Sequence, residues 1–177
     1  MKNLRSTFSL LNIIFILGIL FAGCNTFDKQ NNDHKKTNCC ETNKSLIQQY
    51  YDEVVNTRNV DSIDKFIADD INYYRAEHKG DQVGKKAFID IFNLNTQQFD
   101  NIKFDIIEMI AEGDKVMVRI HGTAIYKPTK GAVDVEGVRI YTIKNGKIVE
   151  KREFWDDVQL LLQTGKIPPF DYEPNLD

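Results

Sequence analysis

The sequence has little cysteine, histidine or proline, and positive charge is not in excess. It contains three cysteines, three histidines and four prolines, and its 23 lysines and arginines are outnumbered by 26 acidic residues. Without a basic stripe, a nucleic-acid partner is not expected. His34, His78 and His121 are isolated, and no cysteine lies beyond Cys40. No metal-ligand spacing is therefore present, and we expect neither a metal nor a cofactor.

The first 23 residues have the pattern of a secretion signal. Lys2 and Arg5 give a short positive segment, and an almost wholly apolar run follows over residues 8–21. This run is shorter than the roughly 20 apolar residues that a membrane-spanning helix needs. Its length and the small residues that follow it are typical of the apolar region of a signal peptide.

The end of this segment resembles a bacterial lipobox. Residues 20–24 read Leu-Phe-Ala-Gly-Cys, with Phe21 where leucine is usual. The resemblance implies that a diacylglycerol is attached to Cys24, which would anchor the chain to a membrane of the cell envelope, outside the cytoplasm. The alternative is an ordinary signal peptide, or an uncleaved anchor, with a cysteine at this place by chance.

The rest of the chain divides into a tether, a folded domain and a tail. Residues 24–43 are polar and lack apolar periodicity, which predicts a disordered tether. Residues 44–166 form the predicted domain, and residues 167–177 form a proline-containing C-terminal tail. Cys39 and Cys40 are adjacent, a spacing that disfavours a relaxed disulfide between them. They either pair between chains in an oxidising compartment or stay unpaired.

The hydrophobic period changes from about 3.6 to 2 near residue 100, which predicts helices followed by strands. Helices are expected at residues 45–55, 61–67, 85–99 and 158–163. Strands are expected at residues 71–74, 102–111, 115–126, 133–143 and 147–155. Asn145-Gly146 is typical of a two-residue type I′ hairpin turn. Helices first and antiparallel strands afterwards indicate an α+β fold.

Three phrases of the sequence carry a family resemblance. They are YYDEVVN at residues 50–56, IAEGDKV at 110–116 and IYTIKNGKIVE at 140–150. They resemble the SnoaL-like polyketide cyclase, or ester cyclase, group of the nuclear-transport-factor-2-like superfamily, over about residues 45–165. The resemblance implies a cone-shaped α+β barrel whose N-terminal helices pack on a curved antiparallel sheet. It does not fix the function, because the superfamily includes enzymes and binding proteins.

The hairpin turn also predicts which strand residues face each other. In a ladder without a bulge, Arg139 lies opposite Arg152 and Tyr141 lies opposite Glu150. Because side chains alternate along a strand, these residues and Asp156 then share one face. The aliphatic residues of the other face favour that face as the core. The resemblance favours the charged face as the lining of a pocket, and the sequence leaves both readings open.

The expected pocket lining combines this charged face with aromatic positions implied by the resemblance. Its members are Tyr51, Tyr74, Arg139, Tyr141, Arg152 and Trp155.

Asp156 is the first candidate for chemistry. It matches the C-terminal aspartate that SnoaL-like cyclases use as a general base. A carboxylate in a partly apolar pocket has a raised pKa and can remove a proton next to a carbonyl. The alternative is that Asp156 only caps the last helix.

Arg119 and His121 are two residues apart and therefore share a strand face. Related epoxide hydrolases have an Arg-x-Asp pair here, and His121 replaces the carboxylate. This departure disfavours epoxide hydrolysis. His121 can act as an acid or base near neutral pH, with Arg119 stabilising an oxyanion, or it can be merely structural.

Two functions are consistent with the sequence. The first is an envelope lipoprotein whose domain binds a small, largely apolar ligand without catalysis, or mediates interactions, including a homodimer through the sheet. The alternative is a cofactor-free cyclase- or isomerase-like enzyme that acts on a small carbonyl compound, with Asp156 as general base. Convergence of Asp156 and His121 on an enclosed cavity would favour the enzyme.

Overall fold

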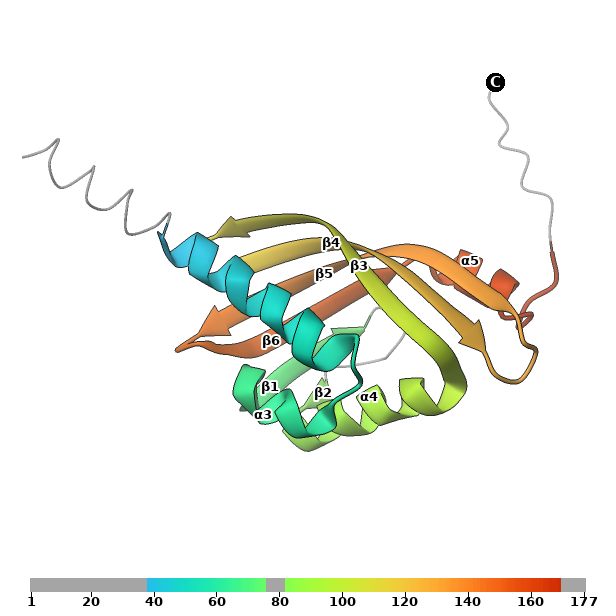
Figure 1. Cartoon of the computed structure of the whole chain (residues 1–177), viewed down its shortest axis with the longest axis horizontal. Coiled ribbons are helices and arrows are strands. Elements are labelled where there is room, and N and C mark those ends of the chain that lie inside the picture. Colours follow the sequence, from blue (N-terminus) through green and yellow to red (C-terminus); the bar gives the residue numbers. More distant parts are fainter. Residues whose placement is uncertain (1–37, 76–81, 170–177) are drawn as a thin grey trace, which may run out of the picture. The chain divides into compact units, whose positions relative to one another are not determined.

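The computed structural model describes residues 38–75 and 82–169 (Figure 1). The predicted signal segment, Cys24, residues 25–37 of the predicted tether, His78 and residues 170–177 lie outside the described residues. The compact unit that holds the fold begins at residue 40, and its described residues are 40–75 and 82–169. Within the described ranges, none of the helices has the length and apolar character needed to cross a membrane.

The first helix begins earlier than the sequence suggests. Residues 38–50 are helical, and one π-helical turn, η1 (Tyr51–Val55), completes the element. The helix thus includes residues 38–43, which the sequence pattern assigned to the tether. Cys39 and Cys40 lie in this helix, where Cys39 is exposed and Cys40 is partly buried.

Shorter helical elements follow along the chain. They are η2 (Val60–Ser62), α3 (Ile63–Phe66), α4 (Lys85–Gln98) and α5 (Asp157–Gln163). The first helix, α3 and α4 lie on the same face of the sheet (Figure 1). α4 packs against two strands of the sheet, β1 (Ile67–Arg75) and β3 (Phe99–Glu112).

The sheet has six strands in the order β2-β1-β6-β5-β4-β3. Their bounds are β1 (Ile67–Arg75), β2 (Gln82–Val83), β3 (Phe99–Glu112), β4 (Lys115–Tyr126), β5 (Ala132–Lys144) and β6 (Lys147–Trp155). The α+β prediction is confirmed. The sheet is mixed, however, because β1 pairs in parallel with β6 while all other pairs are antiparallel. α4 and four strands (β2, β3, β4 and β5) separate β1 from β6 in the chain, which leaves room for this crossover.

The hairpin turn between β5 and β6 is the one expected. Asn145 and Gly146 both have positive φ, 52° and 71°, and Lys144 pairs with Lys147. Beyond Ile143 the ladder shifts by one residue, so the predicted register is wrong from there on.

The shift is a β-bulge, and it reverses the face on which the rest of β6 presents its side chains. Arg139 lies opposite Glu153, not Arg152, and Tyr141 lies opposite Lys151, not Glu150. A one-residue shift exchanges the two faces because side chains alternate with period 2. The bulged register avoids two directly opposed arginines, which would repel each other.

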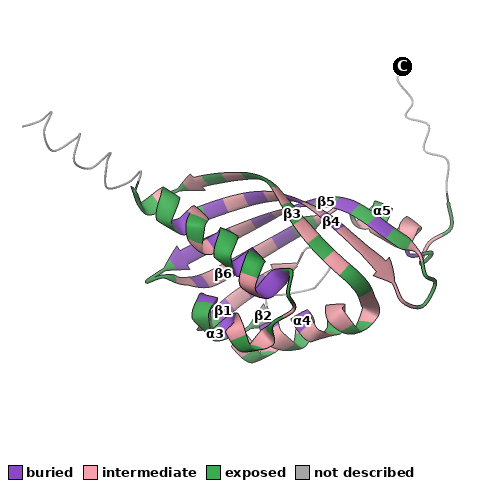
Figure 2. Cartoon of the chain, in the orientation of Figure 1, coloured by how far each residue is buried: buried purple, intermediate pink, exposed green. Residues whose placement is uncertain are grey.

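The core lies between the helices and the inner face of the sheet. Buried residues alternate with less buried ones along the strands (Figure 2). On β4 the inner side chains include Val116, Val118 and Ile120, which are fully buried. The face that carries Arg139 and Tyr141 is thus the inner one, and the aliphatic side chains Val138 and Ile140 lie on the outer face, where they are only partly buried. This resolves the question that the sequence left open.

Candidate functional site

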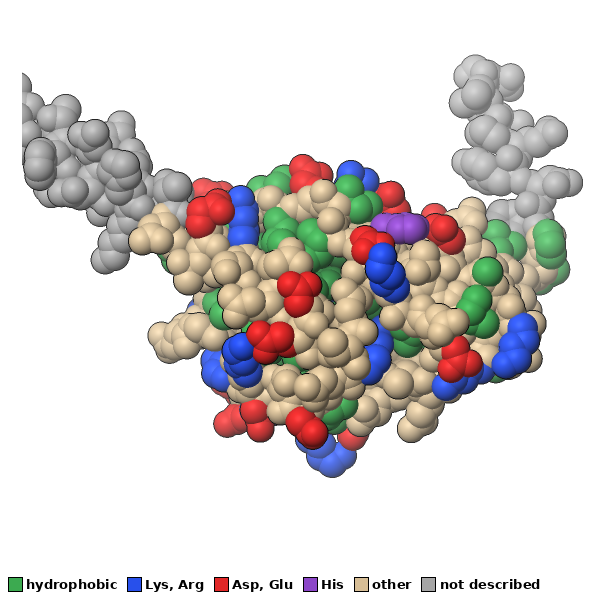
Figure 3. Space-filling view, viewed as in Figure 1, with side chains coloured by type: hydrophobic (Ala, Val, Ile, Leu, Met, Phe, Trp, Pro, Cys, Tyr) green, Lys and Arg blue, Asp and Glu red, His purple; other side chains and the backbone are tan. Residues whose placement is uncertain are grey.

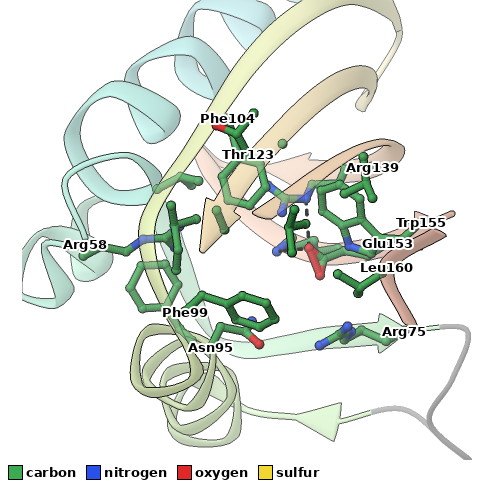
Figure 4. A pocket seen from close by; sticks show the side chains of 18 of the residues that line it. Arg58, Arg75, Asn95, Phe99, Phe104, Thr123, Arg139, Glu153, Trp155 and Leu160 are labelled. Carbon is green, nitrogen blue, oxygen red and sulfur yellow. Dashed lines mark ion pairs between the residues drawn. The ribbon is translucent and has the colours of Figure 1, made fainter. Parts of the chain in front are cut away.

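A cavity of about 120 Å³ opens between the inner face of the sheet, α4 and α5 (Figure 4). Most of its wall is apolar. The apolar lining comprises Val55, Phe92, Phe99, Ile102, Phe104, Ala124, Val133, Val135, Trp155 and Leu160. An apolar concave site with a few polar groups is the usual form of a small-molecule site.

α5 closes one end of this cavity through its fit against β5. Leu160 of α5 lines the cavity. The Gln163 side chain forms two hydrogen bonds with the backbone of Asp134: its Oε1 accepts from the amide N at 2.8 Å, and its Nε2 donates to the carbonyl at 2.9 Å. The helix is therefore held where Leu160 can contribute to the wall.

Two glycines leave room for aromatic rings in the wall of the cavity. A Cβ atom on Gly137 would lie 2.5 Å from Cε3 of Trp155, and one on Gly122 would lie 2.9 Å from Phe104. The bare backbone at these positions lets both rings approach the sheet closely. Their centroids are 5.7 Å apart, so the two rings form one continuous apolar surface.

The polar part of the wall is a buried ion cluster on β5 and β6. Glu153 Oε1 lies 2.8 Å from Arg139 Nε and 2.9 Å from Lys151 Nζ. The side chains of all three are at most 8% exposed. The Arg139 Nε–H does not point at the oxygen, so that contact is an ion pair without a hydrogen bond. All three residues line the cavity.

Tyrosine hydroxyls complete the cluster. Tyr73 donates to Glu153 Oε2, and Arg139 Nη1 donates to the Tyr51 hydroxyl at 2.9 Å. Tyr141 in turn donates to the Tyr51 hydroxyl at 3.2 Å. Burial raises the pKa of each of these tyrosines, so all three hydroxyls stay protonated at physiological pH.

Burial and charge set the protonation of the cluster. Burial alone would raise the pKa of Glu153, but the charges of Lys151 and Arg139 outweigh it and hold this pKa well below its usual value. Glu153 is therefore ionised at neutral pH. Burial, aided by the charge of Arg139, lowers the pKa of Lys151 to about 7 against the opposing effect of Glu153.

Arg58 is a further cation in the wall, which also includes Arg75, and it lies in the turn after η1. Its φ is +58°, and its guanidinium carbon lies 5.4 Å from the ring centroid of Phe92 and 5.5 Å from that of Phe104. Nε and Nη2 are buried and have no hydrogen-bond partner among the described residues. Burial and the charge of Arg139 lower its pKa to about 10, which leaves it protonated at neutral pH.

The residues expected to line a pocket are found in three places. Arg139 and Trp155 line the cavity. Tyr51 and Tyr141 are fully buried beside Arg139 and hold it through the hydrogen bonds described above. Tyr74 and Arg152 are on the outer face. The bulge turns Arg152 outward, and its guanidinium carbon lies 5.1 Å from the ring centroid of Tyr74.

The residues expected to carry chemistry do not reach this cavity. Asp156 is exposed, and its Oδ1 accepts a hydrogen bond from the Gln159 amide at 3.0 Å, which makes it the N-cap of α5. His121 Nε2 lies 2.7 Å from an Asp134 carboxylate oxygen. Asp156 and His121 therefore do not converge on the cavity.

Arg119 belongs to the same outer charged surface as His121. Its Nη1 lies 3.1 Å from Glu136, and its Nε lies 3.7 Å from Glu108. Figure 3 shows the one described histidine at the surface among acidic and basic side chains. No group of three or more potential metal ligands occurs within the described ranges.

Sequence reasoning missed Arg58, Lys151 and Glu153. Lys151 and Glu153 were assigned to the opposite face, and only the bulge brings them inward. Arg58 sits in a polar turn that gives no sign of burial. In the sequence, the bulge could show only as a one-residue break near Val149 in the alternation of inward and outward side chains.

The comparisons with known proteins agree with this fold. The family model of the SnoaL-like polyketide cyclases matches residues 45–164. A solved SnoaL-like polyketide cyclase from Jannaschia sp. CCS1 is 18% identical, covers 73% of this chain and 96% of its own, and has a TM-score of 0.68.

Two further solved structures are similar. AclR of Streptomyces galilaeus, described as a hydroxylase, is 22% identical, with 71% of this chain and 97% of that chain covered and a TM-score of 0.63. TerC, crystallised with polyporic acid, is 15% identical, with 70% and 98% covered and a TM-score of 0.63. No curated protein matches the sequence significantly.

Proposed function

We propose a function from the premise that this chain belongs to the SnoaL-like polyketide cyclase family. Its domain binds a small, largely apolar organic molecule in the cavity and holds it without transforming it. The observation that carries this proposal is the cavity itself, which is walled by aromatic and aliphatic side chains and has one buried ion cluster.

The size of the cavity supports a small ligand. An engineered apolar cavity of about 150 Å³ accommodates benzene, and the cavity here measures about 120 Å³. A molecule built around one ring fits this space better than a fused polycyclic one. The co-crystallisation of TerC with polyporic acid supports an organic molecule as the class of ligand in this fold.

The arrangement of acids and bases supports binding more than catalysis. Asp156, the expected general base, caps α5 instead of facing the cavity. The one carboxylate in the wall, Glu153, is held by two cations and a tyrosine hydroxyl. Because its pKa is held low, it is a weak proton acceptor, and efficient acid/base catalysis needs a pKa near the working pH.

Trp155 offers a direct test, since it is the single tryptophan of the sequence and lines the cavity. Single-ring compounds are titrated against the protein while the tryptophan emission is recorded. We expect a saturable change in the wild type. Val135→Phe, which fills the cavity, should abolish it, and the matched Val138→Phe on the outer face should retain it.

Two results would contradict the proposal. One is a Val135→Phe variant that binds as the wild type does. The other is turnover of a carbonyl compound that Glu153→Gln abolishes, which would replace binding by catalysis.

We also propose that the domain is anchored in the cell envelope through a lipid on Cys24. The support is the lipobox-like sequence at residues 20–24 behind an apolar signal segment. Cells that express the protein are labelled with an alkyne analogue of palmitate and fractionated. The wild type should be labelled and sediment with membranes. Cys24→Ser should lose the label and either leave the membrane or accumulate as precursor, and an unlabelled wild type would refute the anchor.

A further inference from the structure

Arg58 is a cation inside the wall of the cavity, and none of the described residues supplies a counter-ion for it. We propose that the bound molecule is a small monocarboxylate with an apolar body, and that Arg58 binds its carboxylate group. This rests on the proposed function, because it names the chemical class of the ligand for the same cavity.

The unpaired nitrogens of Arg58 form a matched pair. Nε and Nη2 present parallel N–H bonds on one edge of the guanidinium plane, and both lack a hydrogen-bond partner. This edge has the spacing that binds the two oxygens of a carboxylate at once. Two buried donors without partners cost free energy, because they have lost their hydrogen bonds to water. A ligand that satisfies both recovers that cost.

The charges in the cavity wall favour an anionic ligand. Arg139 and Lys151 share Glu153 as their counter-ion. Arg58 has no carboxylate partner in the described part of the chain, and its guanidinium is near enough to Arg139 that the latter's charge lowers its pKa. Both guanidinium carbons lie over the ring of Phe104, at 5.5 Å and 4.5 Å from its centroid. A negative charge between them would be attracted by both.

The geometry places the anion at one end of the ligand. Figure 4 shows Arg58 entering the cavity from the side opposite Arg139 and Glu153. Between these two ends the wall is formed by aromatic and aliphatic side chains, among them Phe99, Phe104 and Trp155. A ligand with its carboxylate on Arg58 thus has its apolar body against these rings, away from the negative charge of Glu153.

The one pair of aligned donors on Arg58 favours a carboxylate over a phosphate. A phosphate monoester carries nearly two negative charges at neutral pH and has more oxygens to satisfy. Arg58 supplies one charge and one pair of aligned donors, which is the complement of one carboxylate.

Benzoate and benzamide are a matched pair of probes, since they have the same shape and differ in charge. Binding of each is measured through Trp155 emission and calorimetry on the full chain. We expect the wild type to bind benzoate at least tenfold more tightly than benzamide. Arg58→Met should remove this preference.

Two further variants serve as controls. Arg58→Lys keeps the charge but loses the paired donors, so we expect most of the preference to be lost. Arg152→Met removes an arginine from the outer face and should change nothing. Thermal melting checks the fold of each variant. Arg58→Met should melt no lower than the wild type, because Arg58 forms no ion pair or hydrogen bond that the substitution would break.

The outcomes separate the two proposals. If benzoate and benzamide bind equally well, or if Arg58→Met and Arg58→Lys both keep the preference for benzoate, the carboxylate assignment is wrong and the cavity remains a binding site. If neither probe nor any other single-ring compound binds, the proposed function fails and the carboxylate assignment fails with it.

Discussion

The buried carboxylate of Glu153 makes the sharpest prediction about stability. Glu153→Gln keeps the shape of the side chain but removes the only negative charge that faces Arg139 and Lys151 in the cavity wall. Removing one partner of a buried ion pair costs about 3–5 kcal/mol, because the remaining charge stays buried without compensation. Since domains are stable by about 5–15 kcal/mol, the loss would be large.

Glu150 provides the matched control. It lies on the same strand, pairs with Arg152 and is partly exposed on the outer face. Exposed ion pairs contribute about 0–1 kcal/mol, so Glu150→Gln should change stability by less than about 1 kcal/mol. Without the bulge, the two glutamates would exchange faces. The comparison therefore tests the register as well as the ion cluster.

The assay is urea unfolding followed by circular dichroism, at several pH values. Because the pKa of Glu153 is lower in the folded protein than its ordinary value of 4.5, its contribution is complete above that pH and is lost on further acidification. The difference between wild type and Glu153→Gln should therefore shrink in acid. Equal destabilisation by Glu150→Gln and Glu153→Gln, or a difference that does not depend on pH, would refute this reasoning.

Three further perturbations have definite expected results. The pKa of Lys151 falls from 10.5 to about 7 on folding. Between those pH values this side chain is protonated only in the unfolded chain, so the stability of the fold should rise with pH. Lys151→Met should flatten that rise in urea titrations. Gly137→Ala would place a Cβ 2.5 Å from Trp155 and should displace the ring, with a loss of about 1–3 kcal/mol and a red-shifted emission; unchanged emission would contradict this. Asp156→Ala should cost about 1 kcal/mol by removing the cap of α5. It should leave ligand affinity unchanged, and a tenfold loss would return Asp156 to the site.

Much of the fold was predictable because its signals are local. The change from helical to alternating periodicity places the helices and strands within a few residues of their observed positions. The Asn145-Gly146 turn has both residues at positive φ, as its type requires. The start of the first helix was misplaced because the polar residues 38–43 show no apolar period, although they are helical in the structure.

The site was less predictable because it depends on two features without a local signal. The bulge beside Val149 involves no glycine, and it decides that Lys151 and Glu153 face inward. Arg58 is buried by Phe92 and Phe104, which come from α4 and β3. A polar turn residue becomes part of a cavity wall only after these distant elements have packed.

Asp156 shows how one motif position supports two readings. An aspartate followed by a short apolar helix satisfies the pattern of a C-terminal catalytic carboxylate and that of an N-cap. The hydrogen bond to Gln159 and the exposure of the side chain identify the cap. Composition and spacing could not separate these readings, because both need the same residue at the same place.

The position of the bulge decides which of two sets of β6 side chains lines the cavity. Lys151, Glu153 and Trp155 face inward in the observed phase, whereas an unbulged strand would present Glu150, Arg152 and Phe154 in their place. Relatives can thus acquire a different wall by moving or removing the bulge, without substituting any residue that touches a ligand. Aligned positions in this strand then need not be equivalent in function. An insertion or deletion here changes ligand chemistry as effectively as a mutation in the site.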